Sequence, residues 1–213
     1  MHSMPDKRQY ISGCKRLPYA VDAPRLQAEV AALPPVVWGN VRAPVHQETV
    51  SVFLRGQAPL QGAAEDVDQP LLSQCPYIRQ LLHEVLPGRC GKCLLASLRA
   101  GGLVYPHTDA ANDYFLGSFR VHVPVFTSSQ VHFFSGRRLF QMAAGEAWSV
   151  NNLAPHAVLN LHPRAPRVHL IFDIFPDASS VELLARLPEA PGTEDEVLFS
   201  QVASRRPAAV QKP

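Results

Sequence analysis

The chain has 213 residues, a formal net charge of +2, and 46% hydrophobic residues against 18% charged ones. This length and composition suit one well-cored globular domain, and the small net charge excludes the strongly basic surface of a dedicated nucleic-acid binder. No apolar run reaches the length of a membrane span, and the first residues lack the apolar centre of a signal peptide. We therefore expect a cytoplasmic protein with neither nucleic acid nor membrane as partner, and the sequence favours no oligomeric state.

Two helices are predicted in the first half of the chain. The first covers 22–33, with Asp22 as N-cap, a proline in its first turn, and apolar residues along one face. The second covers 76–86, an apolar-rich run that ends before a turn sequence. The chain contains 20 prolines spread along its length, which argues against longer helices and for short strands joined by turns.

The segment between these helices, 36–70, has the loop character of a substrate lid. Within it, Trp38, Arg42, His46 and Arg55 are possible substrate contacts. An ordinary surface or core role is the alternative for each of them, because loop residues bind ligands only sometimes.

Cys90 and Cys93 have the C-x-x-C spacing that suggests zinc binding or redox chemistry. A structural zinc site needs four ligands, and the sequence holds no second C-x-x-C pair to supply them. A redox pair would open a helix after a strand, whereas this pair leads into the apolar run "CLLASL". We expect ordinary reduced cysteines.

Short apolar or alternating runs predict strands through the rest of the chain. They are 49–54, 92–98, 119–126, 130–134, 138–142, 146–150, 156–161 and 167–175. Many short strands joined by tight turns indicate a mainly β fold with flanking helices, either a β-sandwich or a jelly roll. From residue 186 the sequence is rich in Pro, Ala and charge, so we expect a loose tail with at most one short turn around Val197–Phe199.

Three residues have the type and spacing of metal ligands. His107 and Asp109 are two positions apart, so in an extended chain both side chains point the same way. His156, at the start of a later predicted strand, is available as a third ligand. Two histidines and one carboxylate on one face of a metal leave three positions open, the arrangement that non-haem Fe(II) oxygenases use. Chance occurrence of such short patterns is the alternative.

Two predicted strands repeat one polar pattern. Arg120 and His122 share the polar face of one strand, and Arg167 and His169 share that of the last strand. A solvent-facing sheet more usually mixes Thr, Lys, Glu and Ser, so these residues fit the lining of a barrel mouth better. The planar guanidinium matches a carboxylate, and one arginine could hold each end of a dicarboxylate. The co-substrate that this implies is 2-oxoglutarate.

The motif series "PHTD…FRVHVPV…GEAWSVNNLAPHAVLN…PRVHLIFD" resembles the aspartyl/asparaginyl β-hydroxylase family of Fe(II)/2-oxoglutarate-dependent oxygenases, which also includes bacterial proline hydroxylases. The resemblance covers about residues 92–176, with every motif in order. It implies the family's double-stranded β-helix, a cupin-like form of the jelly roll. We expect one such oxygenase domain over 1–185, with its core at 92–176 and the N-terminal helices and strands packed outside, followed by the tail over 186–213.

The resemblance also implies roles for single residues. The implied iron ligands are His107, Asp109 and His156, and the implied co-substrate contacts are Arg120, His122 and Arg167. Of these contacts, Arg167 would pair with the distal carboxylate of 2-oxoglutarate, and the other two would lie near its metal-bound end. In the animal aspartyl hydroxylases a glycine stands at the position of Asp109, so this chain is closer there to the proline hydroxylases. His169 and Asp173 are expected to form core hydrogen bonds.

The predicted function is that of an Fe(II)/2-oxoglutarate-dependent dioxygenase that hydroxylates an amino-acid side chain. The substrate would be peptidyl Asp or Asn, or a free or carrier-bound amino acid, so the expected partner is a small amino acid or a short peptide. The cofactors would be Fe(II), 2-oxoglutarate and O₂. Two alternatives stay open: a free L-proline hydroxylase of the same family, and a non-catalytic cupin-like protein that binds a metal or ligand.

Overall fold

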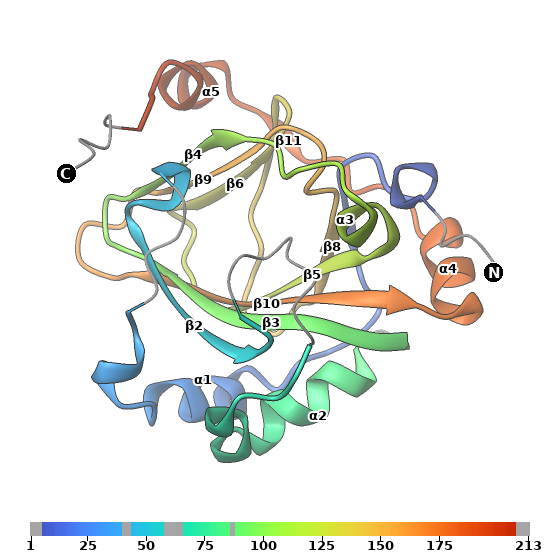
Figure 1. The fold of residues 1–213 in the computed structure, drawn as a ribbon. Coiled ribbons are helices and arrows are strands. Elements are labelled where there is room, and N and C mark those ends of the chain that lie inside the picture. The colour runs from blue at the N-terminus through green and yellow to red at the C-terminus, as the bar shows by residue number, and fades with distance from the viewer. Residues whose placement is uncertain (1–5, 40–43, 58–65, 86–87, 208–213) are drawn as a thin grey trace.

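The computed structural model describes residues 6–39, 44–57, 66–85 and 88–207. The strands are β1 (Cys14–Arg16), β2 (Thr49–Arg55), β3 (Gly88–Leu98), β4 (Leu103–His107), β5 (Phe119–Phe126), β6 (Val131–Ser135), β7 (Arg138–Phe140), β8 (Trp148–Val150), β9 (His156–Asn160), β10 (Arg167–Pro176) and β11 (Thr193–Glu194). They form a six-stranded sheet, in the order β1-β8-β5-β10-β3-β2, and a five-stranded sheet, in the order β11-β7-β6-β9-β4. The two sheets face each other (Figure 1). This arrangement confirms the predicted jelly-roll fold, mainly β with flanking helices.

The central strands of the larger sheet have two different faces. One face is apolar and buried in a single cluster, with Phe119, Val121, Val123 and Val125 from β5 and Val168, Leu170 and Phe172 from β10. The alternate positions carry Arg120, His122 and Arg167, which line a cavity between the sheets. Successive side chains of a strand point to opposite faces, so the sequence pattern explains both surfaces.

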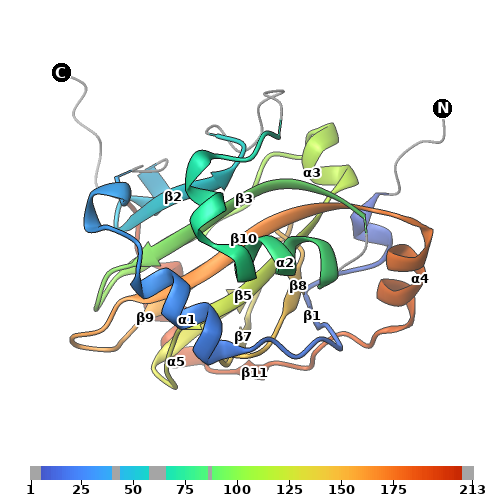
Figure 2. The same cartoon turned by 90° about the horizontal axis from the view of Figure 1, so that it is seen from below.

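Helices α1 (Ala23–Ala31) and α2 (Pro76–Glu84) cover the outer, apolar face of the larger sheet (Figure 2). Asp22 caps the first turn of α1 through its side chain, as predicted. Leu26 of α1 and Ile78 of α2 are both 0% exposed and belong to the apolar cluster of that face. Both predicted helices are therefore confirmed, close to the predicted bounds.

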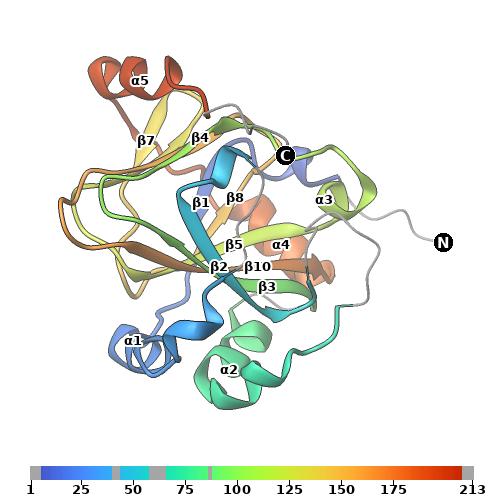
Figure 3. The same ribbon diagram turned by 60° about the vertical axis from the view of Figure 1, so that its left-hand side comes forward.

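The residues after 186 differ from the expected loose tail. Strand β11 pairs with β7, and helix α5 (Glu196–Ala203) packs beside β4 at the smaller sheet (Figure 3). Val202 of α5 is buried together with Tyr105 and Phe134 of that sheet. The helix is short and follows a segment rich in Pro, Ala and charge, but packing against the sheet gives it a partner that composition alone does not reveal.

Several short elements were not predicted. They are α3 (Asp113–Gly117), α4 (Ala178–Arg186) and the 3₁₀ turns η1 (Lys7–Gln9), η2 (Pro35–Val37), η3 (Pro44–His46) and η4 (Pro70–Gln74). Of these, α3 occupies part of the expected polar loop after Asp109. A helix of five residues completes little more than one turn, too few for a periodic pattern to be recognised.

All four cysteines are buried and unbridged, as expected of reduced cysteines. Cys90 and Cys93 lie in the main apolar cluster, where burial raises the pKa of Cys90 to about 12. None of the helices in the described ranges combines the length and apolar character needed to cross a bilayer.

Candidate metal centre

A cavity between the two sheets brings the predicted polar residues together. Its lining includes His107, Asp109, Arg120, His122, His156 and Arg167, and also His46, Asn152 and apolar side chains of both sheets. The six residues expected to hold iron and co-substrate thus share one space, although they lie on four different strands and one loop.

The two histidines of the candidate triad are cross-strand partners. His107 ends β4, His156 begins β9, and their ring centres are 4.2 Å apart. The Nδ1 atom of His107 is 2.7 Å from the carbonyl oxygen of Tyr105, and that of His156 is 3.0 Å from the carbonyl oxygen of Ala154. Because a carbonyl oxygen only accepts, Nδ1 carries the proton in the neutral form of each ring, and Nε2 then keeps the lone pair that a metal needs. Burial lowers the pKa of His156 to about 4, which keeps that ring neutral.

Asp109 supplies the carboxylate of the triad. Its backbone N–H donates to the carbonyl of Asn152, and its Oδ1 lies 3.7 Å from Nε2 of His107. Single donor atoms of His107, Asp109 and His156 all lie within 4.8 Å of one another. Burial raises the pKa of Asp109, but the nearby charge of Arg120 contributes to a net shift well below the ordinary value. One ionised carboxylate and two neutral imidazoles are a donor set that fits Fe(II).

Arg120 joins two carboxylates at the cavity wall. Its Nη1 donates to Oδ2 of Asp109 at 2.6 Å, while its Nε and Nη2 donate to Asp173 at 2.9 and 3.1 Å. Arg120 on β5 and Asp173 on β10 are direct partners in the sheet, so the strand register places them side by side. Burial lowers the pKa of Arg120, but the two aspartates raise it more. Its charge is therefore compensated within the protein.

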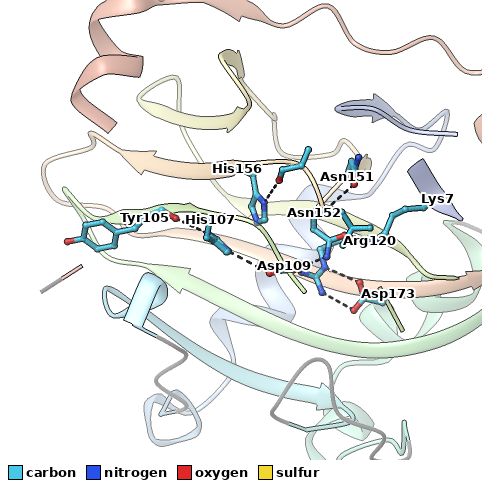
Figure 4. A network of polar contacts seen from close by, with 11 residues as sticks. Lys7, Tyr105, His107, Asp109, Arg120, Asn151, Asn152, His156 and Asp173 are labelled. Carbon is cyan, nitrogen blue, oxygen red and sulfur yellow. Dashed lines mark hydrogen bonds and ion pairs between the residues drawn. The ribbon is translucent and has the colours of Figure 1, made fainter. Parts of the chain in front are cut away.

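Two residues that sequence reasoning missed complete this network (Figure 4). Asn152 donates from Nδ2 to Oδ2 of Asp109 at 2.7 Å, and its Oδ1 accepts a hydrogen bond from Nζ of Lys7. Lys7 is 0% exposed; its burial lowers its pKa to about 7, and the carboxylate of Asp173 opposes this effect. Asn152 lies within a stretch that the motif series includes, but no motif marks the lysine.

Arg167, at the start of β10, has a different environment. It is 3% exposed, its Nη2 lies 2.7 Å from Nδ1 of His169, and no carboxylate among the described residues pairs with it. Its Nε has no hydrogen-bond partner in the described part of the chain. Burial alone lowers the pKa of Arg167 to about 9. His122 lies close by, with its ring centre 5.7 Å from that of His169. A buried cation without a counterion marks a place where an anion would be stabilised.

The residues expected to act as a substrate lid have different positions. His46 lines the cavity, and its ring centre is 4.8 Å from that of the β4 histidine. Arg55 forms an ion pair with Asp68, and Trp38 packs against the main apolar cluster. Arg42 lies outside the described residues. Of the three that the structure describes, His46 is the one that lies at the site.

The chain is similar to known proteins in sequence and in structure. A family model described as aspartyl/asparaginyl beta-hydroxylase matches residues 52–176. A search among curated proteins finds no match. An oxidoreductase of the 2OG-Fe(II) oxygenase family from Burkholderia pseudomallei is similar in structure, with a TM-score of 0.53 and 17% sequence identity over 76% of this chain and 83% of that chain. At this identity, the likeness shows the fold.

Two prolyl hydroxylases are further structural neighbours. One is from Trichoplax adhaerens, in complex with a hypoxia inducible factor oxygen degradation domain peptide fragment, with a TM-score of 0.48 and 13% identity over 85% of this chain and 90% of that chain. The other is a viral collagen prolyl hydroxylase from Paramecium bursaria Chlorella virus-1, with a TM-score of 0.47 and 8% identity over 78% of this chain and 97% of that chain.

Proposed function

This chain belongs to the aspartyl/asparaginyl beta-hydroxylase family, and we propose that it hydroxylates an amino-acid side chain with Fe(II), 2-oxoglutarate and O₂. One observation carries the proposal: a single cavity contains both the cluster of two histidines and a carboxylate and a buried arginine that has no carboxylate partner among the described residues. The cluster suits the metal, and the arginine suits one end of a dicarboxylate.

We propose His107, Asp109 and His156 as the iron ligands. The backbone carbonyls at Nδ1 hold both imidazole rings in the orientation and tautomer that leave Nε2 for the metal. Arg120 keeps the carboxylate of Asp109 ionised and holds its Oδ2. When bound, the metal and its co-substrates supply the oxidation, in which 2-oxoglutarate becomes succinate and CO₂ and one oxygen atom of O₂ enters a substrate C–H bond.

We propose that Arg167 binds the distal carboxylate of 2-oxoglutarate. Its Nε has no partner among the described residues, and an ion pair at this buried position would offset the cost of burying the guanidinium. His169 orients the same guanidinium by accepting a hydrogen bond from Nη2. His122, which also lines the cavity, would lie nearer the metal-bound end of the co-substrate. For Arg120, which was expected at that end, the two ion pairs support a role in holding Asp109 instead.

The substrate proposal is an amino-acid side chain, in a short peptide or in a free or carrier-bound amino acid. Arg120 is already compensated by Asp109 and Asp173, so it is poorly suited to hold an additional carboxylate from the substrate. This favours a neutral reacting group, such as the ring of L-proline, over the carboxylate-bearing side chain of aspartate. His46 is the described lid residue best placed to contact it.

A substrate panel tests this proposal. The protein is incubated with Fe(II), 2-oxoglutarate and O₂ and with free proline, other free amino acids, or short peptides that contain Pro, Asp or Asn. We expect a product heavier by one oxygen atom, formed only when 2-oxoglutarate is present, and with proline preferred to aspartate. Mass spectrometry provides the measurement. Preferential hydroxylation of aspartate would contradict the preference for a neutral group, and the absence of any oxygenated product would contradict the hydroxylase proposal.

A further inference from the structure

The N-terminal segment reaches the candidate metal centre although it lies outside the residues that match the family model. Strand β1 pairs with β8, and the loop after β8 is held to the chain before β1. In that loop, Asn151 donates its backbone N–H to the carbonyl of Gly13 and its side-chain Nδ2 to the carbonyl of Ile11. These bonds place η1 beside the loop, with Lys7 next to Asn152.

Only one orientation of the Asn152 amide satisfies both of its neighbours. The ammonium group of Lys7 has only donors, and the ionised carboxylate of Asp109 has only acceptors. The oxygen of Asn152 must therefore face Lys7, and its NH₂ group must face Asp109. The hydrogen bonds in the structure have this arrangement. The carboxylate and Lys7 require the same orientation, and Lys7 anchors the amide in it by binding the oxygen.

Both side-chain hydrogen bonds to the carboxylate of Asp109 reach the same oxygen atom. Its Oδ2 accepts from Nη1 of Arg120 at 2.6 Å and from Nδ2 of Asn152 at 2.7 Å, whereas Oδ1 lies on the side of His107. We propose that Lys7 is a positioning residue for the metal centre, which acts through the Asn152 amide to hold Oδ2 of Asp109 so that Oδ1 alone binds the metal. The inference rests on the proposed function of the triad.

The position of Lys7 is costly for folding, which sets it apart from an ordinary surface lysine. Its side chain is 0% exposed, and the ion pairs found among the described residues do not include it. Its Nζ lies 5.9 Å from the ring centre of Phe115, a ring that also faces the guanidinium of Arg120 at 4.9 Å. An apolar side chain of similar length would fill the same space without the cost of burying an amine. A role in the site explains why a lysine is there.

A double-mutant cycle on metal binding isolates this role. Co(II) alone, without 2-oxoglutarate or O₂, is titrated into the wild-type protein, Lys7→Met, Asn152→Ala and the double variant. The charge of Lys7 repels a metal cation in both backgrounds, so this effect cancels in the cycle and the coupling through the amide remains. We expect Asn152→Ala to weaken Co(II) binding by about tenfold, because loss of groups that orient metal ligands typically has that effect. We also expect Lys7→Met to weaken Co(II) binding by about tenfold more when Asn152 is present than in the Asn152→Ala background.

Lys15→Met is the matched control. Lys15 is also buried, at 5% exposed, but its Nζ donates to the carbonyls of Leu184 and Leu187. Its replacement should leave Co(II) affinity unchanged. Thermal unfolding checks that each variant is folded. If Lys7→Met is not folded, Lys7→Gln takes its place in the cycle.

The possible outcomes separate the two claims. Equal effects of Lys7→Met in the two backgrounds would overturn the positioning role while leaving the proposed metal site intact. Failure of the wild-type protein to bind Co(II) would overturn the proposed metal site, and the positioning role with it. If Lys15→Met weakened Co(II) binding as much as Lys7→Met, the loss of any buried lysine would be sufficient to weaken binding. That result would also contradict the inference.

Discussion

Arg120 and Arg167 are buried at the same cavity, but their surroundings give them different properties. Arg120 donates three hydrogen bonds to two aspartates, whereas Arg167 contacts a histidine and has an Nε atom without a partner among the described residues. A compensated arginine stabilises its neighbours. An uncompensated one raises the free energy of the ligand-free protein until an anion binds.

Replacing Arg167 tests this difference at the level of one side chain. We expect Arg167→Met to raise the KM for 2-oxoglutarate by about two orders of magnitude, because loss of one partner of a buried charge pair costs about 2–5 kcal/mol. The free energy of unfolding of the ligand-free variant should not fall, since the uncompensated charge has been removed. Steady-state kinetics and chemical denaturation provide the two measurements.

The exposed Arg138 offers the control, since it pairs with Glu194 and lies away from the cavity lining. Arg138→Met should leave the KM for 2-oxoglutarate unchanged. An unchanged KM in Arg167→Met would show that the co-substrate carboxylate binds elsewhere.

Contacts between single residues could be predicted only where the two residues are close together in the sequence. His107 and Asp109 could be paired because two positions in an extended chain point the same way. Neither the ion pair between Arg120 and Asp173 nor the contact of Lys7 could be predicted. The ion pair joins two residues 53 positions apart and depends on the register between their strands. The contact of Lys7 depends on the path of the N-terminal segment.

At the scale of elements, the long strands were predictable, whereas two of the shortest were not. β5 and β10 have eight and ten residues, enough to show an apolar face and a polar face. Strands β1 and β11, with three and two residues, carry no periodic signal. They exist because their neighbours, β8 and β7, offer them backbone hydrogen bonds. The helix α5 likewise depends on the sheet beneath it.

The helices on the outer face of the larger sheet are expected to stabilise the fold without taking part in the chemistry. Leu26 of α1 is 0% exposed in the main apolar cluster, so Leu26→Ala should lower the free energy of unfolding by about 2–5 kcal/mol. Chemical denaturation measures this loss. The KM for 2-oxoglutarate should stay near the wild-type value at temperatures where the variant is folded, because the cavity faces the other side of the sheet.

Val36 provides the comparison for Leu26, since its side chain is 87% exposed. Val36→Ala should change the free energy of unfolding by less than about 0.5 kcal/mol. Equal stability of Leu26→Ala and Val36→Ala would mean that α1 does not contribute the core contacts described here.

At the scale of the whole molecule, the two sheets bring together residues from distant parts of the chain. Composition and strand spacing predicted a mainly β fold, either a β-sandwich or a jelly roll, because many short amphipathic strands have few other ways to bury their apolar faces. The family resemblance of the motif series chose the jelly roll between the two. Neither was sufficient to show that the N-terminal segment contributes to the site. We retain the proposal of a single oxygenase domain, but we extend it beyond residue 185, because β11 and α5 pack on its smaller sheet. We propose that β1 and η1 support its metal centre rather than forming an outer addition.

The proposed function requires that the cavity hold a metal, which would catalyse the oxidation of 2-oxoglutarate by O₂. Its most direct test compares succinate formation by the wild-type protein and by His156→Ala, with Fe(II), O₂ and an accepted substrate from the panel. His156 begins β9 and lines the cavity. Its removal takes one of three proposed ligands and leaves the apolar cluster outside the larger sheet untouched. We predict iron-dependent succinate formation by the wild-type protein and its loss in a folded His156→Ala variant. Undiminished succinate formation by that variant would contradict the account.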